Sequence, residues 1–89
     1  MTRFDFEIAA GDDRVTLRVE AEYVAGEKGT RDEPGQPSYL ESGSAWDPMT
    51  CAYPGFTLDE HERQRRLWAF ETLYALFPVA MTEAAEEQR

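Results

Sequence analysis

The chain has 89 residues, the size of one small domain with a single thin core. It carries 18 acidic and nine basic residues, for a formal net charge of −9. A surface of that charge repels phosphate backbones, so we expect no direct binding of nucleic acid. It attracts basic protein surfaces, unless the acidity serves solubility alone.

Cys51 is the single cysteine, so an internal disulfide is excluded. The first residues lack the basic and apolar regions of a secretion signal. No apolar run approaches the roughly 20 residues that a membrane span requires. These features predict a cytoplasmic protein without membrane contact.

Residues 3–24 predict an antiparallel β-hairpin. Apolar and polar side chains alternate over 3–8 and again over 15–24, and an Ala-Gly-Asp-Asp turn joins the two runs. A hairpin alone is marginal in water, so its apolar face requires a helix as cover. On the opposite face, Glu20 and Glu22 are expected to form an acidic ridge.

Residues 25–44 are rich in Gly, Pro, Ser and charge, which predicts a long loop. Tyr39 and Leu40 are its apolar residues, and they either tuck onto the core or are offered to a partner. Apolar residues alternate again within 45–53, which predicts a third strand. Pro48 would confine that strand to a sheet edge or to its own start.

The strongest helix signal covers residues 57–77. Thr57 and Glu60 have the spacing of a capping box, and Pro78 should end or kink the helix. The tail, 78–89, either extends the helix by a turn or two or frays. One broad side of the helix is apolar at about 100° per residue. The residues of this predicted core face are Leu67, Phe70, Leu73, Tyr74, Leu76 and Phe77.

The first half of the predicted helix, 59–66, has no matching apolar stripe. Arg63 and Arg66 lie in line with the core residues, so this half either projects beyond the core or meets acidic groups on the sheet. Trp68 points away from the apolar face. It is either covered by a loop or exposed as an anchor for a partner, since Trp is enriched at binding hot spots.

These elements together predict a single α+β domain over residues 1–89. Its architecture is a two- or three-stranded antiparallel sheet packed against one long C-terminal helix. No internal repeat is present in the sequence.

Catalytic and metal-binding patterns are weak in this sequence. Cys51 and His61 are the soft ligands, and the carboxylates of Asp59, Glu60 and Glu62 splay around the helix instead of converging beside His61. A nucleophile–base pair of Cys51 and His61 lacks a third, orienting group. We therefore expect no enzyme activity, no metal and no cofactor, with Cys51 as a small core residue.

The layout of the whole chain resembles small accessory proteins of bacteriophages and prophages, and among them the anti-CRISPR proteins. The resemblance lies in size, charge and order: a charged hairpin, a loop with Glu33-Pro34-Gly35-Gln36-Pro37, a capped helix and an acidic tail. It implies a stoichiometric inhibitor that binds a CRISPR effector in the bacterial host cell, often where the effector would hold nucleic acid. It transfers no site residue.

A physical route to such inhibition exists, because CRISPR effectors hold nucleic acid in positively charged channels. A rigid acidic domain can present carboxylates to the Lys and Arg side chains of such a channel. Tyr39 or Trp68 would add an apolar anchor. The candidate partner-binding residues are Glu20, Glu22, Asp32, Glu33, Tyr39, Asp59, Glu60, Glu62 and Trp68.

A second hypothesis is a phage structural or assembly protein, or a self-associating domain. Trp68, Leu76 and the tail would then form a homodimer seam, and the acidity would serve solubility only. A third hypothesis, a small enzyme that uses Cys51 and His61, has the least support in the sequence.

Overall fold

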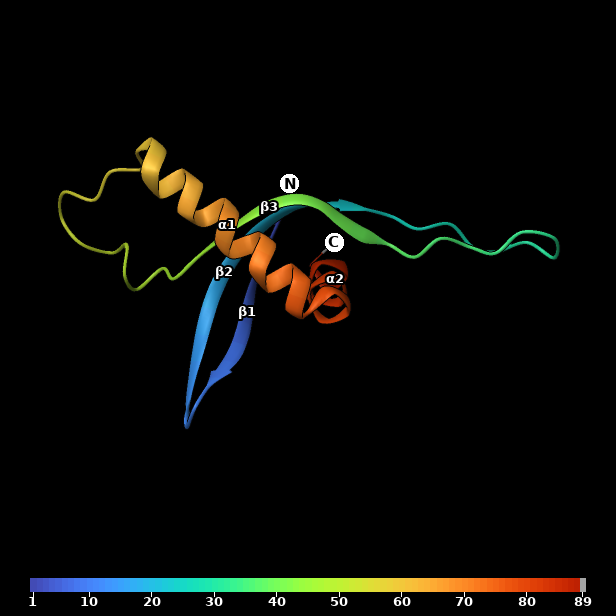
Figure 1. The fold of residues 1–89 in the computed structure, drawn as a ribbon, viewed down its shortest axis with the longest axis horizontal. Coiled ribbons are helices and arrows are strands. Elements are labelled where there is room, and N and C mark those ends of the chain that lie inside the picture. The colour runs from blue at the N-terminus through green and yellow to red at the C-terminus, as the bar shows by residue number, and fades with distance from the viewer. Residues whose placement is uncertain (89) are drawn as a thin grey trace.

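The computed structural model describes residues 1–88. A three-stranded antiparallel sheet of order β1-β2-β3 precedes two helices (Figure 1). The predicted α+β class is confirmed, but the single long helix is replaced by two. The elements are β1 Thr2–Ala10, β2 Asp13–Val24, β3 Tyr39–Trp46, α1 Glu60–Leu76 and α2 Pro78–Glu87.

The predicted hairpin forms from β1 and β2. Phe4 lies opposite Val19, and the register continues to Ala10 opposite Asp13. The loop between them has two residues, and Gly11 at its first position has a φ of 67°. A positive φ at that position suits a type II′ turn, which glycine adopts without strain.

The third strand lies at Tyr39–Trp46, earlier than the predicted 45–53. Leu40 joins the core, whereas Met49, in the predicted strand, is 83% exposed. The chain turns after Trp46, where the Thr50 N–H donates to the Asp47 carbonyl at 3.2 Å. The alternation after residue 48 is wrong as a strand signal, because the chain forms a turn there and pairs with no strand.

The β2–β3 ladder shifts register between Ala21 and Tyr23. Glu41 and Ser42 of β3 therefore both lie opposite Glu22, which is a β-bulge. The bulge lets β3 continue while its inward residues still face the core.

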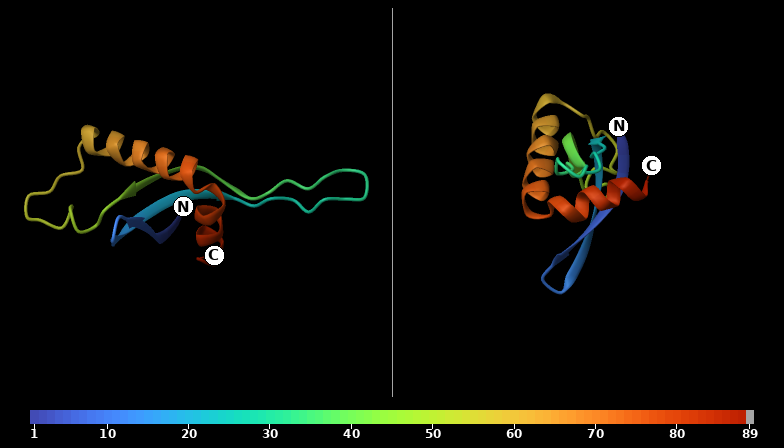
Figure 2. Two further views of the ribbon diagram at one scale, coloured as in Figure 1. Left: turned by 60° about the horizontal axis from the view of Figure 1, so that its bottom comes forward. Right: turned by 90° about the vertical axis from the view of Figure 1, so that its right-hand side faces the viewer.

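The core lies between one face of the sheet and the two helices. α1 packs mainly on β3, and α2 crosses toward β1 (Figure 2). Gly43 permits this approach, because a Cβ there would lie 2.9 Å from the Phe70 ring. The buried apolar residues are Phe4, Val19, Ala21, Leu40, Ala45, Phe70, Leu73, Met81 and Ala85.

The first helix begins two residues later than a Thr57 cap would place it. The carboxylate of Asp59 accepts the Glu62 N–H at 2.9 Å, so Asp59 is the N-cap. The Thr57 hydroxyl instead donates to the Gly55 carbonyl at 3.4 Å. Asp59 and Glu62 have the same capping spacing as Thr57 and Glu60, two residues later in the chain, and Asp is as good a cap as Thr or better.

The helical region breaks at Phe77, whose φ of −132° lies outside the helical range. Pro78 opens α2, where its missing N–H costs nothing and its fixed φ suits the first helical turn. Met81 is 0% exposed, so Pro78–Glu87 of the predicted tail neither continues α1 nor frays but packs as a separate helix, while residue 89 lies outside the described residues.

The predicted core face of α1 is partly correct. Phe70 and Leu73 are buried and Tyr74 is half-buried, but Leu76 is 66% exposed, and Leu67 and Phe77 are exposed as well. α1 covers chiefly β3, one strand of a narrow sheet, so only its middle meets the core.

Residues 25–38 form an extended arm rather than an irregular loop (Figure 1). Glu27 and Gln36 exchange two backbone hydrogen bonds of 2.9 Å, and the Thr30 N–H donates to the Glu33 carbonyl at 2.8 Å near the tip. A Cβ at Gly29 would lie 2.7 Å from the Gly35 nitrogen, so glycine lets the two sides approach closely.

Candidate functional site

A groove lies where the arm leaves the domain, between the start of β3 and the two helices. Its volume is about 410 Å³. We call it the arm-base groove. Its lining residues are Pro37, Ser38, Tyr39, Tyr74, Pro78, Val79, Thr82, Glu83 and Glu86.

Hydrogen bonds between distant segments hold the walls of the arm-base groove. The Leu40 N–H donates to the Tyr74 hydroxyl at 3.1 Å, which ties β3 to α1. The Tyr23 hydroxyl donates to the Glu86 carboxylate at 2.8 Å, which ties β2 to α2. Tyr74 also stacks on Phe70 with ring centroids 5.7 Å apart. Contacts within the domain therefore hold the walls of the groove in place.

The lining combines exposed apolar surface with carboxylates. Tyr39 is 45% exposed and Val79 is more exposed still, so neither is covered by the domain itself. Glu83 and Glu86 line the same groove from α2. Lys and Arg side chains lay apolar stems along such a surface while the charged head meets a carboxylate.

Further carboxylates lie near the base of the arm. Glu22 and Glu41 oppose each other across the bulge, both are exposed, and neither has an ion-pair partner within residues 1–88. Like charges opposite one another on a sheet are destabilising. An acidic cluster that the domain leaves unneutralised is suited to a basic partner.

Glu20 does not add an unpaired carboxylate to the acidic ridge expected for the hairpin. Arg3, opposite it in the register, holds its carboxylate at 2.7 Å. Arg18 and Asp5 pair at 3.4 Å on the same outer face. The ridge therefore shifts toward Glu22 and Glu41, and sequence reasoning missed Glu41 because its segment was assigned to a loop.

Asp32 and Glu33 lie at the exposed far end of the arm. The Glu33 N–H donates to the Thr30 hydroxyl at 3.1 Å, which helps to shape the tip. The structure does not bring these two carboxylates into the arm-base groove, where Tyr39 alone of the sequence-predicted residues is found.

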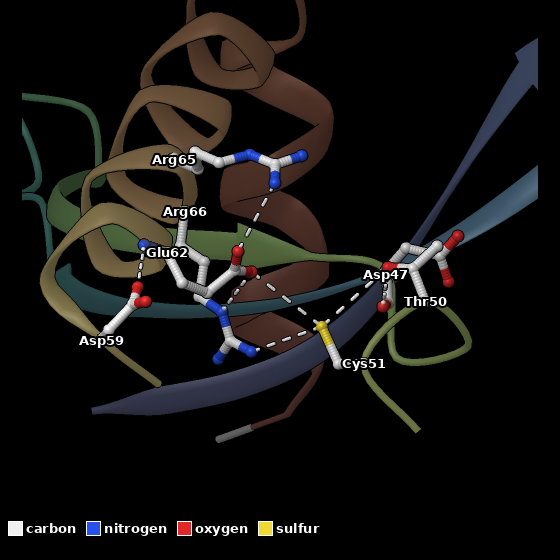
Figure 3. A network of polar contacts seen from close by, with 7 residues as sticks. All are labelled: Asp47, Thr50, Cys51, Asp59, Glu62, Arg65 and Arg66. Carbon is white, nitrogen blue, oxygen red and sulfur yellow. Dashed lines mark hydrogen bonds and ion pairs between the residues drawn. The ribbon is translucent and has the colours of Figure 1, made fainter. Parts of the chain in front are cut away.

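The carboxylates at the start of α1 are engaged within the domain (Figure 3). Asp59 caps the helix by accepting the Glu62 N–H. Glu60 accepts the Gln64 side-chain amide at 3.1 Å. Glu62 pairs with Arg66 at 3.4 Å and with Arg65 at 3.6 Å. These groups act first as local structure, since a partner would have to compete for them.

Arg66 fastens the first half of α1 to the sheet. Its guanidinium lies 4.5 Å from the Trp46 ring centroid and 5.5 Å from that of Phe56. It also donates to the Cys51 sulfur at 3.5 Å. The sequence left two alternatives for this half, projection beyond the core or contact with acidic groups on the sheet. In the structure Arg66 instead contacts an aromatic side chain of the sheet, Trp46, through a cation–π interaction.

Trp68 is 70% exposed, so no loop covers it. It borders a hollow of about 330 Å³ that also contacts Leu17, away from the arm-base groove. Its exposure agrees with the anchor hypothesis and leaves open which partner it meets.

Cys51 is half-exposed rather than part of the core, and its neighbours are Thr50, Glu62 and Arg66. In residues 1–88 the structure brings no three His, Cys, Asp or Glu side chains together as a metal site. None of the helices in this range has the length and apolar character to cross a membrane.

No protein-family model, curated protein or solved structure matches this chain. The structure shows an α+β domain with a projecting arm and an acidic, partly apolar groove at the base of that arm.

Proposed function

We propose that the protein is a non-enzymatic binding protein for a basic protein surface, with the arm-base groove as the contact. The observation that carries this proposal is the joint presence of exposed Tyr39 and Val79 and the carboxylates of Glu83 and Glu86 in one groove. A Lys or Arg side chain of the partner fits both parts of that lining.

Charge alone would give a weak complex. An exposed ion pair contributes about 0.2–1 kcal/mol and is screened by salt. Burial of apolar surface adds about 25 cal/mol per Å², which Tyr39, Val79 and the partner's alkyl stem supply together. Glu22 and Glu41 would raise the rate of encounter with a basic partner.

The particular partner that we propose is a nucleic-acid-handling protein, with a CRISPR effector as the leading case. The net charge of −9 and the resemblance to anti-CRISPR proteins support it. The domain is slender, with extents of 56 × 32 × 21 Å, so its arm end can enter a basic channel. Occupation of that channel in the bacterial cytoplasm would exclude nucleic acid.

Capture of tagged protein from a lysate that contains CRISPR effectors tests this proposal. We expect retention of an effector at low salt, loss at high salt, and reduced target-DNA binding by the purified effector. Glu83→Lys should weaken capture strongly. Glu87→Lys makes the same charge change on α2 outside the groove and serves as the matched control. Equal capture by both variants would contradict the groove as the contact.

Self-association is the second candidate function. Trp68 and Leu76 are spaced by eight residues on α1, and both are more than half exposed. A second copy would cover them. If so, the mass measured by light scattering should rise with protein concentration, and Trp68→Ala should return the protein to a monomer at all concentrations.

A further inference from the structure

A second groove gathers positive charge on this acidic chain. It lies between the sheet and the first half of α1 and has a volume of about 440 Å³. Arg3 from β1 and Arg63 and Arg66 from α1 all line it. They are three of the nine basic residues of the chain, and Glu20 is the one carboxylate in the lining. We call it the arginine groove.

The three guanidinium groups keep hydrogen-bond donors for a ligand. Arg3 uses its Nε and Nη2 on one Glu20 oxygen. Arg66 uses its Nε on Glu62 and its Nη2 on Cys51. A guanidinium has five N–H donors, so the Nη1 of each remains. Arg63 makes no ion pair or side-chain hydrogen bond within residues 1–88, although it lines the groove.

Apart from Ser44, the remaining lining is apolar. Trp46 contributes its indole, and Leu58 and Leu67 are both exposed beside it. Arg66 lies over the Trp46 ring and within 5.5 Å of the Phe56 ring centroid, so these aromatic contacts hold its guanidinium in place in the groove wall. A bare anion would leave this apolar surface in water, whereas a ring attached to the anion would cover it.

From this juxtaposition we propose that the arginine groove binds a small ligand in which a carboxylate or a phosphate is attached to a flat apolar ring. The anion meets Arg63 and the free edges of Arg3 and Arg66, and the ring packs on Leu58, Leu67 and Trp46. A long polyanion is disfavoured, because its outer charges would face the acidic remainder of the surface. This site is independent of the basic-partner function proposed above.

The experiment is a titration of the whole chain with phenyl phosphate and with benzoate, followed by NMR. The indole N–H of Trp46 reports on the groove, and that of Trp68, which lies outside it, is an internal control. At about 0.15 M salt, distant charges are screened. With phenyl phosphate or benzoate we expect the Trp46 signal to shift saturably and the Trp68 signal to remain unchanged. With neutral benzyl alcohol we expect no saturable shift. The tighter of the two anions identifies the ligand's charged group.

A pair of variants separates the groove from general attraction. Arg63→Gln should weaken binding of the preferred anion about tenfold, the effect expected for loss of a charge-assisted hydrogen bond. Arg65→Gln removes the same charge from the same helix outside the groove and should leave binding within about twofold. Both variants should keep the dispersed spectrum of the folded domain. Absence of a saturable Trp46 shift with either anion, or equal loss in the two variants, would overturn the proposal.

Discussion

The guanidinium of Arg66 lies 4.5 Å from the ring centroid of Trp46, and this contact holds the amino-terminal half of α1 against the sheet. That half has no apolar stripe of its own. Glu62, one turn earlier on the helix, fixes the guanidinium at 3.4 Å. The apolar pattern of this helix segment gives it no surface to pack on the sheet. The Arg66 guanidinium, which lies between the Trp46 and Phe56 rings, holds it there instead.

We expect Arg66→Gln to destabilise the domain by about 1–2 kcal/mol, because a largely desolvated cation–π contact and its ion pair are lost. Urea unfolding measures the change. Arg65→Gln is the control, since Arg65 has the same charge but an exposed side chain. A similar loss of stability in both variants would mean that the positive charge on the helix, rather than the contact with Trp46, stabilises α1.

Gly43→Ala should cost about 1–3 kcal/mol. The new Cβ would lie 2.8 Å from the Ala21 side chain and 2.9 Å from the Phe70 ring, and neither can move freely in a packed core. Ser42→Ala, at the neighbouring exposed position of β3, should change the thermal midpoint little. An unchanged midpoint for Gly43→Ala would show that α1 sits farther from β3 than this structure has it.

Met81→Ala tests whether α2 belongs to the core. Met81 is fully buried, so its truncation should reduce the free energy of unfolding by about 2–5 kcal/mol. Val79→Ala, on the exposed side of the same helix, should cost less than about 0.5 kcal/mol. If Met81→Ala and Val79→Ala reduced the free energy of unfolding by similar, small amounts, α2 would be a frayed tail.

Glu41→Lys should stabilise the domain by about 0.2–1 kcal/mol, because it converts a like-charge pair with Glu22 into an attractive one. The gain should shrink as salt rises. Glu71→Lys changes the same charge on the exposed surface of α1 and should lack most of that gain. Equal stabilisation by both would point to the net charge rather than to the Glu22–Glu41 pair.

Replacement of residues 27–36 by an Asn-Gly turn should leave the stability of the domain nearly unchanged. Every residue of that segment is exposed, so no core contact is lost. The segment contributes no residue to the lining of the arm-base groove, so under the proposed function the shortened protein should still capture its basic partner. A large fall in the urea midpoint would instead show that the arm supports the sheet.

Local patterns predicted the elements whose side chains alternate or repeat cleanly. The hairpin follows from alternation on both sides of one Gly-containing turn, and the helix start is marked by capping residues within two positions of the observed cap. The third strand was predicted too late in the chain, because Ser42, Gly43 and Ser44 have little strand propensity and Leu40 is its single large buried residue.

The candidate site was less accessible to sequence reasoning. Tyr39 was identified as an apolar residue in a polar segment, but Glu83 and Glu86 belong to a tail whose helix and position depend on burial of Met81. No spacing rule connects residue 39 to residue 83, since they meet only after β3 and α2 pack around α1.

The sequence by itself determined the charge of the surface, the hairpin, the helical region and the break at Pro78, because each depends on residues within a few positions of one another. The tertiary structure alone decided the rest. It placed β3 where Gly43 leaves room for the Phe70 ring, and it left Trp68 exposed. It also assembled two grooves from separate segments. These outcomes depend on which surfaces meet, and packing selects them after the local elements have formed.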